Sequence, residues 1–182
     1  MTATVIIVLA AGMLVIVIFN RAVRMKTLVA EAASGIDVQL KRRYDLIPNI
    51  VEAVKGYMQH ERTVLEKVTL LRSEAQRAGS VQDKAAVENQ LSAALKHVLA
   101  LAENYPDLKA SKNFLDLQSA LIGVEDELQL SRRYYNGTVR NYNILVQSFP
   151  GNLVASVFRF KPAEFFEIEY ATERRNPDVK FT

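Results

Sequence analysis

The stretch DVQLKRRYDLIPN, residues 37–49, decides the fold, because it places Pro48 inside a region whose composition is otherwise typical of helix. A proline at this point either separates two helices or lies within one bent helix. Apolar residues beyond residue 28 recur mostly three and four positions apart, and this spacing crosses Pro48 without a change of phase. We therefore predict one long helix that runs from the N-terminal region to about Gln76 and is kinked at Pro48. The residues of this apolar stripe are Val29, Ala33, Ile36, Leu40, Tyr44, Ile47, Val51, Val54, Met58, Leu65, Val68 and Ala75.

Pro48 carries an energetic cost within a helix. Its nitrogen has no hydrogen to donate to the carbonyl group of Tyr44, and a proline in a helix interior costs about 3 kcal/mol. Packing of the long apolar stripe can offset that cost. The alternative is a true break, in which Asp45 caps a second helix and Pro48 lies in its first turn.

Residues 2–20 predict a membrane anchor, because they carry no charge and are almost all apolar. A helix of this length spans about 30 Å, the thickness of the hydrocarbon core of a bilayer. A cleaved signal peptide would have a basic segment ahead of its apolar run, and none precedes this one. Arg21, Arg24 and Lys26 follow the span. The positive-inside rule then predicts a single-pass protein of the cell (inner) membrane, with membrane lipid as a partner and the polar part in the cytoplasm.

The basic triplet of Lys41, Arg42 and Arg43 should lie too far from the anchor to contact lipid head groups. An unbroken helix places Lys41 about 30 Å beyond Arg21, whereas the Debye length at physiological salt is about 8 Å. One interpretation is local pairing, because Asp37 and Asp45 each lie four residues from Lys41. The other is contact with a neighbouring subunit or a partner protein.

The remainder of the chain predicts further helices. One should begin near Asp83 and stop before Pro106, a second long one should begin after Ser111 and end at FPGN, and a short one should cover NLVASVF. The fold is therefore expected to be all-α. A transmembrane anchor (1–20) leads into an antiparallel bundle of three long helices and a short fourth (21–158), with coiled-coil packing, and an extended aromatic-rich tail (159–182) follows.

Several polar residues lie on the apolar stripes and are candidates for structural or interface roles. Buried charges are tolerated when they are paired, and two Tyr-Asn pairs seven residues apart should share one helix face. From Phe158 to Tyr170, at the start of the tail, five aromatic residues fall within thirteen positions, which predicts burial across an adjacent subunit or, alternatively, against the chain's own bundle. The candidates are Arg42, Arg43, Pro48, Glu61, Glu125, Arg132, Asn136, Asn143, Phe160, Phe165 and Phe166.

Composition gives no support for an enzyme. The chain has no cysteine, so thiolate metal sites and disulfides are excluded. His60-Glu61 opens like a zinc-protease motif, but Val64 stands where the second histidine would be. Neither a glycine-rich phosphate loop nor a nucleophile elbow is present. The net charge of +3 is too small to indicate nucleic-acid binding. We expect no catalytic residues, cofactor or metal.

Three long segments resemble the bacterial LemA family: IDVQLKRRYDLIPNIVEAVKGYMQHE, YPDLKASKNFLDLQ and RRYYNGTVRNYNILVQSFPGNLVASVFRF. The resemblance covers nearly the whole chain beyond the anchor. It implies a single-pass anchor followed by an antiparallel helical bundle, and it implies no known reaction. Some members of the family are associated with membrane remodelling or magnetosome membranes, and others with membrane metalloproteases.

Two functions are consistent with these features. The first is a membrane-anchored scaffold that forms homo-oligomers and organises or remodels membrane. The second is an adaptor or sensor bundle for a membrane partner such as a metalloprotease. Large homo-oligomers would favour the scaffold, and a monomer that co-purifies with a partner would favour the adaptor.

Overall fold

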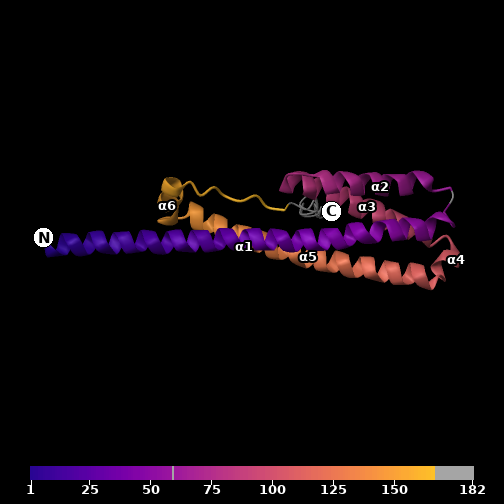
Figure 1. The fold of residues 1–182 in the computed structure, drawn as a ribbon, viewed down its shortest axis with the longest axis horizontal. Coiled ribbons are helices and arrows are strands. Elements are labelled where there is room, and N and C mark those ends of the chain that lie inside the picture. Colours follow the sequence, from indigo (N-terminus) through magenta and orange to yellow (C-terminus); the bar gives the residue numbers. More distant parts are fainter. Residues whose placement is uncertain (59, 167–182) are drawn as a thin grey trace, which may run out of the picture. The chain divides into compact units, whose positions relative to one another are not determined.

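The structure is a computed structural model that describes residues 1–58 and 60–166. Their regular structure is helical throughout (Figure 1). The described residues divide into two compact units, which are taken one at a time below. The first unit comprises Met1–Lys41 and Asp126–Phe165, and the second comprises Arg42–Glu125 and Phe166. The helices are α1 (Thr2–Lys55), α2 (Arg62–Arg77), α3 (Val81–Ala102), α4 (Pro106–Lys109), α5 (Lys112–Gln147) and α6 (Gly151–Phe158).

Helix α1 continues through Pro48, as the unchanged phase of the apolar stripe predicted. The alternative of a break capped by Asp45 is therefore not what the structure shows. The predicted end of this helix is wrong, however. α1 stops at Lys55, and residues up to Gln76 belong to the separate helix α2.

The break between α1 and α2 has a local cause. Gly56 has a low helix propensity, and the amides of Tyr57 and Met58 both bond to the carbonyl of Val54, which closes the end of the helix. Met58 is nevertheless buried, and so is Leu65 in α2. Because buried apolar residues occur both in the turn and in α2, the apolar spacing continues through the turn. The spacing alone therefore does not show where α1 ends.

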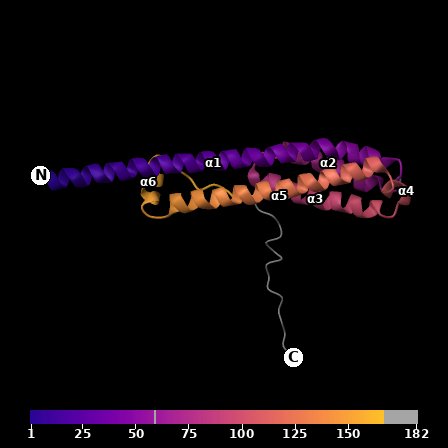
Figure 2. The ribbon, with the colours of Figure 1, turned by 90° about the horizontal axis from the view of Figure 1, so that it is seen from below.

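The first unit contains the N-terminal part of α1, the C-terminal part of α5, α6 and the segment after it (Figure 2). Its apolar cluster is formed by Tyr142, Val146 and Ala155, against which Met25, Val29, Phe160 and Ala163 pack. Gly151 is required at the start of α6, since a Cβ atom there would lie 2.0 Å from the carbonyl oxygen of Leu145. The α5–α6 corner therefore depends on a close backbone approach that only glycine permits.

In the second unit, α2 and α3 pack side by side, and the C-terminal part of α1 and the N-terminal part of α5 complete the unit. Ser80 caps α3 by accepting a hydrogen bond from the amide of Asp83 at 3.0 Å. Pro106 begins the short α4, where its missing N–H costs nothing. The buried apolar residues of the unit include Ile47, Ile50, Val54, Met58, Val68, Leu91, Val98 and Leu108.

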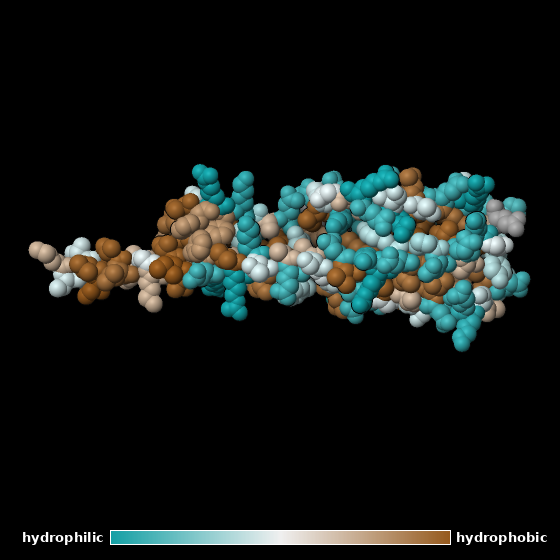
Figure 3. All heavy atoms as spheres, in the orientation of Figure 1, coloured by the Kyte–Doolittle hydropathy of each residue, from teal (hydrophilic) through white to brown (hydrophobic). Residues whose placement is uncertain are grey.

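Among the helices of the described part, α1 alone is long and apolar enough to cross a membrane. Its most apolar 18-residue window has a mean hydropathy of 2.8, and none of that window is buried. Figure 3 shows apolar side chains gathered over this end of α1. This part of α1 therefore has the length and composition of a membrane span.

Candidate functional site: a buried polar network in the second unit

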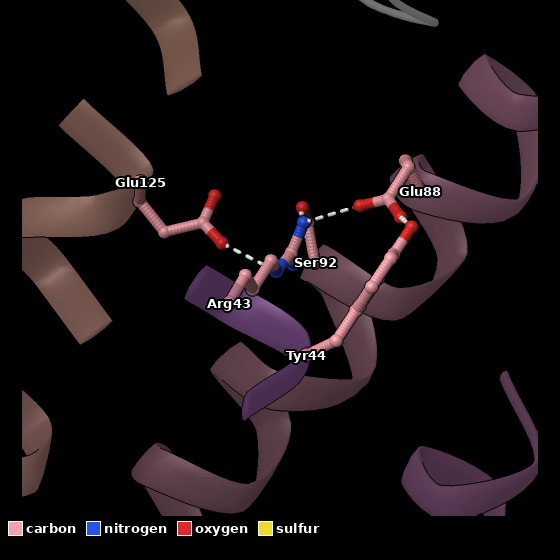
Figure 4. A network of polar contacts seen from close by, with 5 residues as sticks. All are labelled: Arg43, Tyr44, Glu88, Ser92 and Glu125. Carbon is pink, nitrogen blue, oxygen red and sulfur yellow. Dashed lines mark hydrogen bonds and ion pairs between the residues drawn. The ribbon is translucent and has the colours of Figure 1, made fainter. Parts of the chain in front are cut away.

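The guanidinium group of Arg43 is the centre of a polar network in the second unit (Figure 4). Its side chain is fully buried. Nη1 donates to Oε2 of Glu88 at 2.7 Å, Nη2 donates to Oγ of Ser92 at 2.8 Å, and Nε lies 2.8 Å from Oε1 of Glu125. Because α1, α3 and α5 each supply at least one of these residues, one arginine joins three helices.

Glu88 is held from two sides. It is fully buried in α3, and its second oxygen accepts a hydrogen bond from the hydroxyl of Tyr44. Glu125 differs, because its side chain remains 29% exposed. One buried guanidinium therefore faces two carboxylates, and water can solvate the second carboxylate.

A further contact compensates for Pro48. Proline cannot donate to the carbonyl oxygen of Tyr44, which lies four residues earlier in α1. Instead, Nε of Arg72 in α2 donates to that oxygen at 2.7 Å. The second unit thus supplies from α2 the hydrogen bond that the helix itself lacks.

This network has a structural role, because it links α1, α3 and α5 in the second unit. Its two charged partners with fully buried side chains, Arg43 and Glu88, bind each other, and each also forms one hydrogen bond to a neutral hydroxyl group, that of Ser92 or Tyr44. A buried ion pair adds little stability over apolar residues, but loss of one partner costs about 3–5 kcal/mol. The arrangement therefore penalises any register of α1 against α3 and α5 that separates these side chains.

A second polar contact in this unit joins the α1–α2 turn to the residue before α4. The hydroxyl of Tyr105 donates to Oε2 of Glu61 at 2.7 Å. This hydrogen bond is the main cause that raises the pKa of Tyr105 above 10.0, and desolvation and the negative charge of Glu61 act in the same direction. Glu61, a candidate for a structural or interface role, is half-buried and paired with Tyr105.

In the first unit, α5 holds residues 161–164 by their backbone. Asn143 forms two hydrogen bonds with Ala163, accepting from its amide at 2.8 Å and donating to its carbonyl at 2.9 Å. Tyr142 donates to the carbonyl of Lys161 at 3.0 Å, and Tyr135 donates to that of Glu164 at 2.9 Å. Burial raises the pKa of both tyrosines.

These contacts bear on the predicted tail. Residues 161–164 fold back on the chain's own α5, which was the alternative to packing across an adjacent subunit. Phe160 packs against the cluster of Tyr142 and Val146. Phe165 is 42% exposed, whereas Phe166 is buried. Tyr170 and the rest of the predicted tail lie outside the described residues.

The remaining candidates are distributed between the two units. In the second unit Arg42 is exposed. In the first, Arg132 is buried and Asn136 is half-buried. Arg43 of the basic triplet is buried against Glu88 and Glu125 of its own chain, so this side chain is not available to a neighbouring subunit or a partner protein.

Three network residues were not found from the sequence: Arg72, Glu88 and Ser92. A signal for Glu88 was available. It falls three residues after Ala85 and three before Leu91, and all three are buried on α3. A carboxylate at that spacing indicates a buried partner for a basic residue. Arg72 and Ser92 resemble many other polar residues on helix surfaces, so the sequence offers no comparable signal.

Within the part of the chain that the structure describes, no group of three or more histidine, aspartate and glutamate side chains is arranged to hold a metal ion. The described residues combine a long exposed apolar helix end with two helical units and a buried polar network. In this part of the chain the regular structure is helical, and one helix has the length and composition to span a membrane.

The model of the LemA family matches residues 32–181, so the chain belongs to the LemA family. It is 28% identical to Protein LemA of Metamycoplasma hominis, over 88% of this chain and 72% of that protein. It is 23% identical to Magnetosome protein MamQ 2 of Paramagnetospirillum magneticum, over 82% of this chain and 64% of that protein. It is 22% identical to Magnetosome protein MamQ of Magnetospirillum gryphiswaldense, over 73% of this chain and 58% of that protein. The chain thus spans less than two thirds of the length of these MamQ relatives.

Proposed function

We propose that this LemA-family chain is a membrane-anchored helical scaffold that associates with copies of itself and organises or remodels the membrane. The observation that carries the proposal is the exposed apolar end of α1. Residues 2–20 contain no charged side chain, and large apolar side chains from Val5 to Val17 are exposed. An exposed surface of this kind is stable in a bilayer and unstable in water.

Self-association is supported by exposed apolar side chains on α5. Leu115 and Ile122 of the second unit are each about half-exposed and lie seven residues apart. At about 100° per residue, these two positions fall on one side of the helix. Heptad-like spacing of apolar residues is the pattern by which helices of two chains pack together.

The test measures both membrane attachment and mass. Full-length protein should stay in the membrane fraction after extraction at alkaline pH, and a variant lacking residues 2–20 should not. In mild detergent, light scattering should give a mass of several chains. The double variant Leu115→Glu, Ile122→Glu should lower that mass, while Ala120→Glu, at an exposed position on the other side of α5, should not. A monomeric wild type, or alkaline release of the full chain, would contradict the proposal.

The orientation follows from the basic residues after the span, which favour a cytoplasmic location of the polar part. The chain has no cysteine, so one can be introduced as a unique label. Gly79, in the α2–α3 turn, is exposed and has no atom within 4 Å of an added Cβ. Gly79→Cys should resist a membrane-impermeant maleimide in intact cells, and labelling without permeabilisation would reverse the orientation.

One feature favours the adaptor as a second candidate. In the second unit, a groove of about 770 Å³ opens between the end of α1 and α2, lined in part by Val51, Met58, Leu65 and Leu70. Apolar grooves of this size accept side chains of partner helices. A monomer whose co-purifying protein is lost in Leu70→Glu would favour this function over the scaffold.

A further inference from the structure

Helix α6 has one buried side and one strongly apolar exposed side. Val154 and Ala155 are buried in the first unit. Leu153 and Val157, four residues apart, are 59% and 74% exposed, and Phe149, just before the helix, is 80% exposed. Figure 3 shows apolar side chains over α6 as well as over the neighbouring part of α1. Exposed large apolar residues gathered on so short a helix indicate a surface that is covered in use.

The position of α6 identifies what covers it. The ring of Phe19 lies 4.7 Å from that of Phe158 and 5.6 Å from that of Phe160, measured between centroids. Phe19 is the last apolar residue of the uncharged stretch, and Arg21 follows it closely. If residues 2–20 cross the bilayer, Phe19 lies where the helix leaves the hydrocarbon core. The contacts with Phe19 therefore hold the C-terminal end of α6 at the level of the membrane interface.

The charges around α6 suit a lipid surface. Arg21, Arg24 and Lys26 are exposed on α1, and Arg159 and Lys161 are exposed immediately after α6. Neither the first thirty residues nor residues 148–161 contain an acidic side chain. Basic residues next to exposed apolar ones are the pattern of a helix that lies in the head-group region of an anionic membrane.

We propose that α6 is an interfacial helix: Phe149, Leu153 and Val157 enter the head-group and acyl-chain boundary of the same bilayer that α1 spans, and Arg159 and Lys161 contact anionic head groups. The bilayer covers this apolar surface of α6 because the surface lies next to the proposed membrane span of α1, and lipid surrounds that span. This inference rests on the proposed membrane anchor. It gives each chain two points of contact with one leaflet, which fixes how the first unit is tilted against the membrane.

The chain contains no tryptophan, so a single introduced tryptophan reports on one site. Val157→Trp would be prepared in the full-length protein and reconstituted into vesicles of phosphatidylcholine and phosphatidylglycerol, with and without brominated acyl chains. Ile7→Trp, within the span, is the positive control. Leu70→Trp, an exposed apolar position on α2 in the second unit, is the matched negative control.

We expect brominated lipid to quench the fluorescence of Val157→Trp and Ile7→Trp but not that of Leu70→Trp. Adding Leu153→Glu to Val157→Trp should reduce the quenching, and so should removing the anionic lipid. If Ile7→Trp is quenched and Val157→Trp is not, the interfacial helix is ruled out and the anchor stands. If neither is quenched, the anchor fails as well. Blue-shifted but unquenched emission from Val157→Trp would also overturn the inference, because another protein surface would then cover α6.

Discussion

Arg72 of α2 donates a hydrogen bond of 2.7 Å to the carbonyl oxygen of Tyr44 in α1, the acceptor that Pro48 cannot serve. This contact explains how a proline is accommodated within a 54-residue helix, seven residues before its last residue, Lys55. The Tyr44 carbonyl, to which Pro48 cannot donate, accepts from a donor on α2. The hydrogen bond that Pro48 cannot form is thus replaced by one that links the two helices.

This hydrogen bond predicts that substitutions at Arg72 and at Pro48 have coupled effects on the free energy of unfolding. Arg72→Met leaves the Tyr44 carbonyl without a donor and should lower the free energy of unfolding by about 1–3 kcal/mol. In a Pro48→Ala background the alanine amide serves that carbonyl, and the loss should be smaller. Urea unfolding in mild detergent, followed by far-ultraviolet circular dichroism, measures the cycle. Arg77→Met, at an exposed position of α2, is the control, and strictly additive effects would disprove the coupling.

Pro48→Ala alone should retain full helical content, because α1 already continues through this residue. The circular dichroism of the folded Pro48→Ala variant, recorded before urea is added, measures this helical content.

Arg43 should be far less tolerant of substitution than its neighbour Arg42. Arg43→Ala leaves Glu88 buried without its charged partner, and such losses cost about 3–5 kcal/mol. Arg42 is exposed, so Arg42→Ala should change stability by no more than about 0.5 kcal/mol. The same unfolding measurement compares the two. Equal, small effects would show that the network does not hold the second unit together.

Asn143 should control how firmly residues 161–164 are held. Asn143→Ala removes both of its bonds to the backbone of Ala163. At about 0.5–1.5 kcal/mol for each bond, the exchange rate of the Ala163 amide should rise by roughly ten-fold or more. Hydrogen exchange followed by mass spectrometry measures this rate. Asn141→Ala, at an exposed position of the same helix, should leave it unchanged, and protection that survives Asn143→Ala would argue against this attachment.

Alkaline pH should destabilise the first unit through Tyr135 and Tyr142. Burial raises the pKa of both above 10.0, so the unfolded chain loses its phenolic protons first. The stability contributed by the protonated phenols is complete below pH 10 and falls as the pH rises through the raised pKa values. Thermal unfolding between pH 9 and pH 12 should show this decline, with a smaller slope in the Tyr135→Phe, Tyr142→Phe variant. An identical slope would exclude these tyrosines as the cause.

Apolar periodicity was sufficient to predict an all-helical chain and the passage of α1 through Pro48. It failed to predict the turn between α1 and α2, because Met58 within that turn and Leu65 in α2 are both buried and keep the spacing of the stripe. Gly56 was the available local signal. In the first unit, Phe160 packs on Tyr142 of its own chain, which is the alternative that the sequence left open beside packing across an adjacent subunit.

The polar network around Arg43 was only partly predictable from the sequence. Apolar periodicity placed Glu125 near one stripe and Arg43 beside another, but it did not indicate that these two residues pair. Pairing depends on which helices meet and at what height, and that is a tertiary property that spacing along one helix does not contain. Glu88 could have been found as a carboxylate between buried positions of α3, whereas Arg72 acts on a backbone carbonyl and leaves no such pattern.

We propose that the anchored chain assembles and organises membrane. Electron cryomicroscopy of vesicles carrying full-length protein tests this proposal, with the Leu115→Glu, Ile122→Glu variant at equal density on matched vesicles. We expect clustered or ordered protein and an altered vesicle size or curvature for the wild type, and loss of both for the variant. Wild-type protein dispersed as single copies on vesicles of unchanged shape would contradict it.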